Sequence, residues 1–369
     1  MLHALCALRF LNQRRNLMNS RERVLTTIAH KEPDRVPLFF NGIEAKFVRA
    51  IAQGDMIKTW NQLGVDVFVT ARRAWCGDTP TGLGYSPNPP PPEESLGGAI
   101  YAGWNGIDEF GRRWEHGRYV GGAVATRNDL LKYSPELKLN ERYSRPLMED
   151  WKKNYSDHAF ALFSHSGPLG LTIEAFGLID FCYALYDKRA LIQESAELKT
   201  QWFIETSKYA VELGVDFVVM GDDMGFKGHG YVSPSDFKEL AFPYYRRIVD
   251  SLSVPVFWHS EGYIRDYIPM AVEAGIKGLH GMEPGAGMDM GEIKREFGKD
   301  LILLGNADGN QILCQSDLEL VRREVDRCLK EGMKGGGYMF SIAGSAHEGI
   351  QLEALIEMCR YAQRAGIYH

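Results

Sequence analysis

Residues 215–261 read VDFVVMGDDMGFKGHGYVSPSDFKELAFPYYRRIVDSLSVPVFWHSE, and this stretch holds two strand patterns with a helical pattern between them. The apolar runs at 215–220 and 254–258 show no polar alternation, which is typical of parallel strands buried on both faces. Between them, a serine and a proline at 233–234 precede an amphipathic run to about residue 252, as at a capped helix start. The stretch therefore predicts a β-α-β unit of a parallel sheet.

The same alternation of strand and helix continues in both directions along the chain. Further apolar runs, most of them ending in Gly, Asn, Asp or His, predict six more strands, and a second clear helix at about 264–274 stops before Gly275. Eight strands in a β/α repeat predict an α/β fold, a (β/α)8 TIM barrel, with its active site at the C-terminal ends of the strands. The predicted strands are 36–40, 65–70, 159–163, 215–220, 254–258, 278–280, 301–304 and 338–340.

A long irregular insertion of nearly ninety residues follows the second predicted strand. It contains a proline-rich run at 87–92 and, at 108–115, a turn pattern leading into a short strand. Loops of this length are commonly functional, so both a lid over the barrel mouth and a surface hairpin are compatible with it. We predict a single barrel domain at 20–369, preceded by an N-terminal extension at 1–19.

The composition, 45% hydrophobic and 24% charged, is that of a globular protein. The net charge is −6 and no Lys/Arg-rich block occurs, so we expect no nucleic-acid partner. No uninterrupted apolar run approaches the ~20 residues that span a bilayer, and most of the charge at 1–17 follows the apolar part, the reverse of a secretory signal. We expect a cytoplasmic protein without a membrane partner, and a homodimer as the default assembly.

Polar side chains gather just past the predicted strand ends, where the active sites of barrels form. His259 and Glu261 are two residues apart at one strand exit, close enough to bind one cation. A third ligand from Glu283 or His347 would complete a catalytic zinc site with one open position. The strand-end residues are Asn41, Asp222, Asp223, His259, Glu261, Glu283, Asn306, Asp308 and His347.

Structural roles for these residues stay open. A single Asp at a strand end often caps the next helix, which applies to Asp223 and Asp308. His259 could equally be a hydrogen-bonded core residue, with Glu261 as the partner of a nearby arginine. A nucleotide cofactor is not expected, because neither GxGxxG after the first strand nor GxxxxGK[ST] is present.

Several segments, in order along the chain, resemble the uroporphyrinogen decarboxylase superfamily, which includes corrinoid-dependent methyltransferases. The resemblance runs from about Ser20 to the C-terminus and implies the TIM-barrel fold. The segments are Ser20-Arg-Glu-Arg-Val-Leu25, Pro33-Asp-Arg-Val-Pro37, the stretch 108–115, Gly221-Asp-Asp-Met224 with Ser233-Pro234, His259-Ser-Glu-Gly262, Ala286-Gly-Met-Asp289, Gly305-Asn-Ala-Asp308 and Gly336-Gly-Tyr-Met-Phe-Ser341.

The two branches of the superfamily differ in an N-terminal segment. In true decarboxylases an arginine-rich segment holds an octa-carboxylate porphyrinogen, whereas residues 39–44 of this chain contain no arginine. The resemblance therefore favours the methyltransferase branch. Cations for a carboxylated substrate could still come from Arg72, Arg73, Arg112 and Arg113.

The thiol-methylating corrinoid enzymes of this superfamily carry His-x-Cys at the fifth strand and a second Cys after the last strand. This chain has His259-x-Glu261 and Gly344-Ser345 at these positions. The resemblance therefore implies a ligand set without thiolates, in which His347 replaces a missing ligand.

Imidazole and carboxylate ligands leave zinc a stronger Lewis acid than thiolates do, which suits polarising an ether oxygen. We therefore expect a methyltransferase that moves a methyl group between a small substrate, such as a methoxylated aromatic, and a corrinoid, in an O-demethylation. The chain lacks the Asp-x-His-x-x-Gly corrinoid signature, so the resemblance implies a separate corrinoid protein as partner. Tetrahydrofolate or a methylamine is also compatible with the fold.

The expected catalytic residues are His259, Glu261 and Asp222. Asp222 would orient the substrate or donate a proton, while His259 and Glu261 would hold the zinc. The expected substrate-binding residues are Asn41, Trp258, Asn306 and Phe340, with Tyr338 as a further aromatic candidate.

Two alternatives stay open. In the first, the protein is a metal-free decarboxylase in which Asp222 stabilises a protonated pyrrole. In the second, it is a catalytically silent barrel that docks a corrinoid carrier.

Overall fold

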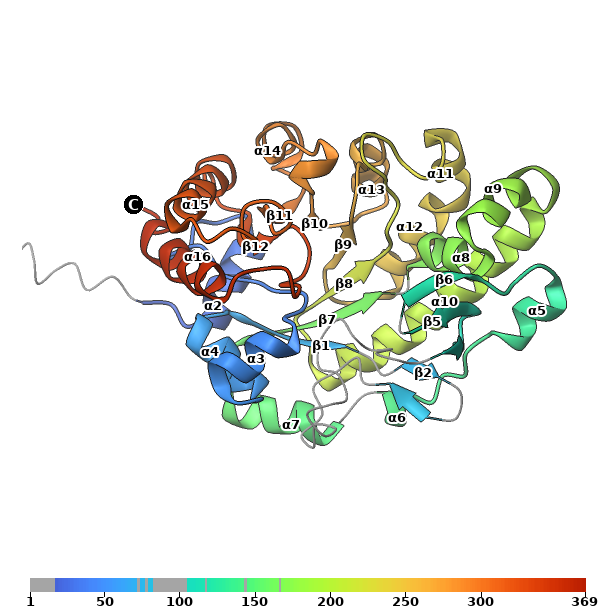
Figure 1. The fold of residues 1–369 in the computed structure, drawn as a ribbon, viewed down its shortest axis with the longest axis horizontal. Coiled ribbons are helices and arrows are strands. Elements are labelled where there is room, and N and C mark those ends of the chain that lie inside the picture. Colours follow the sequence, from blue (N-terminus) through green and yellow to red (C-terminus); the bar gives the residue numbers. More distant parts are fainter. Residues whose placement is uncertain are drawn as a thin grey trace, which may run out of the picture.

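A computed structural model of the chain describes residues 17–71, 74–76, 79–81, 105–116, 118–142, 145–165 and 167–369. Its centre is a seven-stranded sheet in which all neighbouring strands run parallel. Figure 1 shows these strands following one another in a curve, with helices outside it. They confirm seven of the eight predicted strands. In spatial order they are β1 (Val67–Ala71), β7 (Ala159–His165), β8 (Phe217–Gly221), β9 (Val256–Ser260), β10 (Gly278–Gly281), β11 (Ile302–Ala307) and β12 (Tyr338–Ile342).

Helices occupy the connections between the strands, so the alternating order predicted from the sequence is confirmed. Their starts follow ordinary capping chemistry. For example, the Asp317 carboxylate accepts the backbone N–H groups of Glu319 and Leu320 at the start of α15. The helices are α2 (Ser20–Ile28), α3 (Ala45–Ala52), α4 (Met56–Leu63), α5 (Arg127–Lys132), α6 (Leu139–Arg142), α7 (Arg145–Asn154), α8 (Pro168–Phe176), α9 (Leu178–Asp187), α10 (Arg189–Leu213), α11 (Pro234–Leu240), α12 (Phe242–Ser251), η1 (Arg265–Tyr267), α13 (Ile268–Glu273), η2 (Pro284–Ala286), α14 (Met290–Phe297), α15 (Leu318–Gly332) and α16 (Leu352–Ala365).

The helix predicted at 233–252 is two helices, α11 and α12, which meet at Ala241. Pro243 stands in the first turn of α12, where its missing N–H costs nothing, but inside one continuous helix it would remove a backbone hydrogen bond. Ser233 caps α11 as predicted, because its side chain accepts the N–H of Asp236.

The predicted strand at 36–40 forms one isolated bridge instead of a regular ladder. Leu38 bridges Phe340 of β12 in parallel, and the Phe39 N–H donates to the Phe340 carbonyl at 3.0 Å. On its other side, the Asp66 N–H donates to the Leu38 carbonyl at 2.9 Å, just before β1 begins. Pro37 has no N–H to donate, which limits regular pairing of so short a segment. The segment therefore lies between the two ends of the curved sheet.

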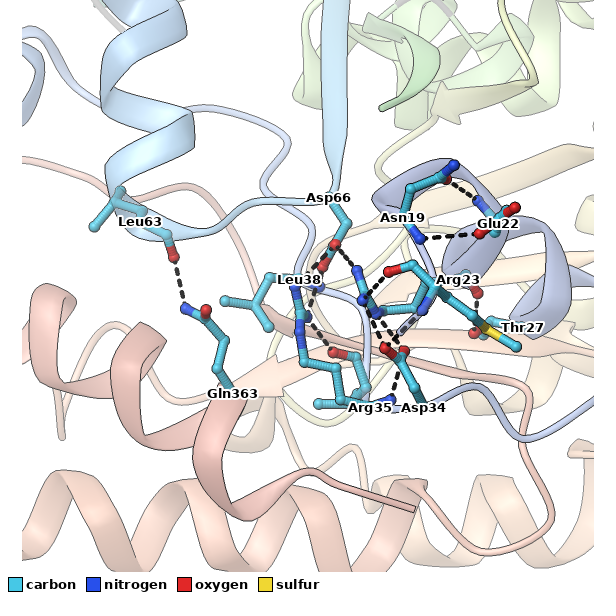
Figure 2. A network of polar contacts seen from close by, with 12 residues as sticks. Asn19, Glu22, Arg23, Thr27, Asp34, Arg35, Leu38, Leu63, Asp66 and Gln363 are labelled. Atoms are coloured by element: carbon cyan, nitrogen blue, oxygen red, sulfur yellow. Dashed lines mark hydrogen bonds and ion pairs between the residues drawn. The ribbon is translucent and has the colours of Figure 1, made fainter. Parts of the chain in front are cut away.

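An ion-pair network holds this segment at the N-terminal side of the sheet (Figure 2). The buried Asp66 carboxylate accepts Nη1 of Arg23 at 2.6 Å, Nη1 of Arg35 at 2.8 Å and the Leu38 N–H at 2.8 Å. Arg23 also pairs with Asp34 at 2.6 Å. The network joins α2, residues 34–38 and the start of β1, at the end of the strands opposite to the predicted site.

The described parts of the insertion contain two small antiparallel sheets, β2 (Ala74–Cys76) with β3 (Thr79–Thr81), and β4 (Gly106–Ile107) with β5 (Arg112–Glu115) and β6 (Arg118–Gly122). The predicted turn and strand at 108–115 are confirmed, since the Gly111 N–H donates to Asp108 and β5 follows. The proline-rich run at 87–92 lies outside the described residues. The hairpin of β5 and β6, called the insertion hairpin below, packs on α8, where the Ala123 N–H donates to the Ala175 carbonyl at 2.9 Å.

Alternate residues of the strands pack in two separate clusters. One cluster joins side chains of six strands with Phe39, including Phe163, Val219 and Phe257, so it lies on the concave side of the sheet. The other includes Val218 and packs the convex side against the helices. Every second residue of a strand therefore points to the inside of the curve.

No single helix among the described residues is long and apolar enough to cross a membrane. Helices α8 and α9 reach that length and apolar character only when taken together, and the pair is bent by 103°.

Candidate active site

The candidate site lies at the C-terminal ends of β8 and β9. His259 follows Phe257 on the concave face, and it is 1% exposed. Its Nε2 atom is 3.7 Å from Oε1 of Glu261 and 3.8 Å from Oδ1 of Asp223. The Asp223 carboxylate also accepts the Glu261 N–H at 2.9 Å, which ties the two strand exits together. One imidazole and two carboxylates therefore converge, and the predicted pair of His259 and Glu261 is part of this group.

Behind His259, a second buried histidine continues the polar chain into the sheet. Nδ1 of His280 is 2.7 Å from Nδ1 of His259, and Nε2 of His280 is 3.2 Å from the Ser341 hydroxyl. Burial lowers the pKa of His259 to about 4, so the ring is neutral at neutral pH and Asp223 and Glu261 face an uncharged group.

Among the described residues, no lysine or arginine forms an ion pair with Asp223 or Glu261. Burial, followed by the charges of Asp223 and Glu283, raises the pKa of Glu261 to about 8. The Glu261 carboxylate reaches across to the loop after β12, where a Cβ atom placed on Gly344 would be only 2.7 Å from its Oε1. Glu261 thus occupies space that a side chain at position 344 would need.

The donor atoms fit a borderline divalent cation such as zinc, which binds imidazole nitrogen and carboxylate oxygen. In the part of the chain that the structure describes, no three or more His, Cys, Asp or Glu side chains already stand in a metal-binding arrangement. The Asp223 and Glu261 side chains are 40% and 41% exposed, which leaves them room to turn toward a cation. The chemistry of the donor set therefore fits zinc, whereas its assembly into a coordination shell requires side-chain movement.

Replacing Glu261 with Gln is expected to change the pH dependence of stability in metal-free protein. A folded-state pKa of about 8, against 4.5 for an ordinary glutamate, means that the folded protein retains a proton which the unfolded chain releases between these values. The free energy of unfolding of the wild type therefore falls as pH rises through this window. The free energy of unfolding of Glu261→Gln should match that of the wild type at pH 4.5 and exceed it at pH 8.5 by on the order of 1 kcal/mol. The difference is this small because solvent screens the partly exposed carboxyl group.

The measurement is urea unfolding of chelator-treated protein at both pH values. Glu149, an exposed glutamate on α7, supplies the control Glu149→Gln, which should track the wild type. An equal difference between Glu261→Gln and the wild type at both pH values would contradict the raised pKa.

A pocket of ≈ 220 Å³ opens beside the convergent group. Gly221 and Asp223 form its wall at the end of β8, and Gly221 is opposite His259 in the β8–β9 ladder. The remaining lining is apolar or aromatic with one carboxylate, from α8, the start of α9, the insertion hairpin and the loop after β8. These residues are Tyr119, Gly170, Leu171, Ile173, Glu174, Leu178 and Tyr231.

Arg112, which contacts the pocket residue Glu174, is already engaged in ion pairs. Its Nε donates to the buried Asp108 at 2.7 Å and its Nη1 to Glu174 at 3.0 Å. Of the other arginines proposed to bind a carboxylated substrate, Arg113 donates from Nε to the Gly122 carbonyl and is exposed, while Arg72 and Arg73 lie outside the described residues. The described wall of the pocket therefore carries more negative than positive charge.

Asp222 was expected from the sequence to be catalytic, but it does not join the convergent group. It is 1% exposed, and its carboxylate accepts the Gly170 N–H at 2.5 Å and the Tyr245 hydroxyl at 2.7 Å. Burial raises its pKa to about 7. Adjacent residues at a strand end point in different directions, so Asp222 anchors the first turn of α8 while Asp223 faces His259.

Trp258 and Phe340 do not line the site, which corrects the expectation that they bind substrate. Both lie in the convex cluster, and Trp258 packs against Phe237 and Tyr245 while its Nε1 donates to the Asp222 carbonyl. The reason is strand alternation, because His259 points inward and its neighbour Trp258 must point outward. The further candidate Tyr338 lies in the same convex cluster.

Asn306 and His347 are also engaged elsewhere. The buried Asn306 amide donates to the Met282 carbonyl at 2.8 Å and accepts from Arg327 at 3.1 Å. Both ring nitrogens of His347 meet backbone groups, Gly309 at 3.2 Å and Gly349 at 3.1 Å. Neither side chain is directed at His259.

Glu283 lies near the site, and Asn41 is a half-buried polar residue that directly follows the segment at 36–40. The Glu283 carboxylate accepts the Gly262 N–H at 3.3 Å, just after Glu261, and contributes to the raised pKa of Glu261. The Asn41 side-chain oxygen is buried and has no hydrogen-bond partner in the structure as described. An acceptor of this kind is costly unless a ligand or water satisfies it.

His280, Ser341 and Glu174 were missed by the sequence analysis. A signal for His280 was present, because it is the last residue of the predicted strand at 278–280, and the site was expected at the C-terminal ends of the strands. Nothing in the sequence indicated that Ser341 would meet His280 or that Glu174 would line the pocket, since these contacts join distant segments.

Comparison with known proteins gives the following relationships. Residues 152–365, more than half of the chain, match the family model described as Uroporphyrinogen decarboxylase (URO-D). The uroporphyrinogen decarboxylase of Hydrogenovibrio crunogenus is 25% identical over 176 residues, which are 46% of this chain and 47% of that protein. The chain thus spans about half the length of this curated relative.

Among solved structures, a methyltransferase from Methanosarcina mazei aligns with a TM-score of 0.69 at 16% identity. The alignment covers 94% of this chain and 99% of that chain. At this level of identity the likeness concerns the fold alone.

Proposed function

The chain belongs to the uroporphyrinogen decarboxylase family, and from this premise we propose that it is a methyltransferase that moves a methyl group between a small substrate and a corrinoid carried by a separate protein. The observation that carries the proposal is the neutral, buried imidazole of His259 between the carboxylates of Asp223 and Glu261 beside a small pocket. A methoxylated aromatic is the substrate class that we propose first, with O-demethylation as the reaction.

Zinc would be held by His259 and Glu261. For the third ligand, Asp223 lies nearer to His259 than Glu283 and His347, the two candidates proposed from the sequence. When bound, it would supply Lewis acidity at the heteroatom that carries the methyl group. Glu261 would supply a carboxylate ligand where the thiol-methylating corrinoid enzymes of the superfamily have a cysteine. Asp223 would hold Glu261 in place, because its carboxylate accepts the Glu261 N–H.

The pocket residues would bind and orient the substrate. Leu171, Ile173 and Leu178 offer an apolar wall for a ring, and Tyr119 and Tyr231 add aromatic surface. The unpartnered Asn41 oxygen would accept a hydrogen bond from a substrate hydroxyl.

The charge of the site disfavours the alternative, a metal-free decarboxylase of a porphyrinogen. Such a substrate carries eight carboxylates, whereas Asp223 and Glu174 line the pocket and Arg112 is committed to Asp108 and Glu174. Like charges at short range cost several kcal/mol in a partly desolvated site.

We also infer that the sheet closes as an eight-stranded TIM barrel, with residues 36–40 as the eighth strand. The bridge from Leu38 to Phe340 and the hydrogen bond from Asp66 to Leu38 support this closure. The site would then lie at the mouth of the barrel, the usual place for catalysis in this fold.

The test measures the zinc content of freshly purified protein and methyl transfer from methoxylated aromatics to cob(I)alamin, followed by its absorbance. We expect about one zinc per chain and formation of methylcobalamin with at least one donor. A protein that takes up no zinc on reconstitution, and that releases CO₂ from uroporphyrinogen, would overturn the proposal in favour of the decarboxylase.

A further inference from the structure

We propose that His280 and Ser341 are positioning residues that fix His259 in the tautomer whose Nε2 lone pair faces Glu261 and Asp223. This inference rests on the proposed function in assigning His259 as a ligand, but its geometry stands independently. The residues come from β9, β10 and β12, and no catalytic contact with substrate is assigned to His280 or Ser341.

The Ser341 hydroxyl has one proton to donate. Ser341 Oγ donates to the Ile342 carbonyl at 3.0 Å. Toward His280, 3.2 Å away, the hydroxyl therefore acts as the acceptor. Nε2 of His280 must carry the proton of that hydrogen bond.

A neutral imidazole carries one N–H, so Nδ1 of His280 is left as an acceptor. His280 is 0% exposed and lies edge-on to Phe39 with ring centroids 5.2 Å apart. Such surroundings favour the neutral ring over an imidazolium. The 2.7 Å contact between the two Nδ1 atoms then requires His259 to donate.

With its single proton on Nδ1, neutral His259 presents a lone pair at Nε2. The opposite tautomer would point an N–H at Glu261 and Asp223, which makes a hydrogen-bond donor but no metal ligand. Histidine ligands of metals commonly donate their second N–H to a fixed acceptor in this way, and loss of that partner costs about 10–100-fold in metal affinity.

The strand register places the two histidines side by side. His259 and His280 are opposite each other in the β9–β10 ladder, and their ring centroids are 4.7 Å apart. Because both residues belong to paired strands, the sheet and not a loop brings the two rings together.

The direct test is NMR of the metal-free protein labelled with ¹⁵N-histidine, using long-range ¹H–¹⁵N correlations to tell protonated from unprotonated ring nitrogens. The His259 signals are assigned by their loss in His259→Ala. We expect Nδ1 protonated and Nε2 unprotonated in His259, and the reverse in His259 would overturn the proposal.

The hydrogen bonds from His259 through His280 to Ser341 form a relay, and one variant separates the effect of this relay from a general loss of stability. Ser341→Ala removes the acceptor, so His280 should move its proton to Nδ1 and His259 should shift toward the Nε2–H tautomer, with zinc and cobalt affinity reduced about 10–100-fold. Ser207, whose buried hydroxyl has no partner among the described residues, supplies the matched control Ser207→Ala, which should keep both wild-type readouts. Ser341→Thr retains the hydroxyl and should restore them.

The two proposals fail in different ways. A wild-type protein with the expected tautomer but no zinc uptake would sink the proposed function and leave the relay intact. Unchanged tautomer and metal affinity in Ser341→Ala would sink the relay while zinc binding and methyl transfer remain.

Discussion

Replacing His259 with alanine is expected to remove bound zinc almost completely and to lower methyl transfer by at least about 10³-fold, a loss of ~4 kcal/mol in transition-state stabilisation. His259 supplies the one imidazole of the convergent group, and the remaining donors, Asp223 and Glu261, offer only carboxyl oxygens, with the pKa of Glu261 raised by burial and by the charge of Asp223. Without the nitrogen ligand, the site lacks the donor that zinc prefers over harder cations.

The measurement is metal content by elemental analysis together with the rate of methylcobalamin formation. The control is His229→Ala, since His229 is an exposed loop histidine that contacts Phe226 and lies outside the described pocket lining. It should retain wild-type zinc and rate. Full zinc occupancy in His259→Ala would show that the ligand assignment is wrong.

Replacing Asp66 with alanine is expected to lower the free energy of unfolding by about 3–5 kcal/mol without changing the residues of the site. The Asp66 carboxylate is fully buried and satisfies Arg23, Arg35 and the Leu38 N–H at once (Figure 2). Its loss leaves two guanidinium groups without their buried partner and one backbone donor unsatisfied.

Urea unfolding at neutral pH measures this change. Asp150→Ala on α7 is the matched control, because Asp150 is exposed and bonds only the neighbouring Asn154 among the contacts described, so its effect should stay within about 0.5 kcal/mol. If Asp66→Ala costs no more than this control, the network does not hold residues 34–38 to the sheet.

Much of the fold could be predicted because the strands are marked locally. The apolar runs that became β8 and β9 need only their own residues to be recognised, since both faces of each strand are buried. The segment at 36–40 carried the same pattern but forms only one isolated bridge. Pro37 cannot donate a hydrogen bond, and the partners of the segment, Phe340 and Asp66, are far apart in the sequence.

The sequence by itself determined the parallel sheet and the pairing of His259 with Glu261, because uninterrupted apolar runs and a two-residue spacing at a strand exit depend only on near neighbours in the chain. The tertiary structure alone decided that Asp223, and not Asp222, faces His259, and that His280 and Ser341 stand behind it. These contacts depend on the register between strands and on the direction in which adjacent side chains point, which are fixed only when the whole sheet is packed.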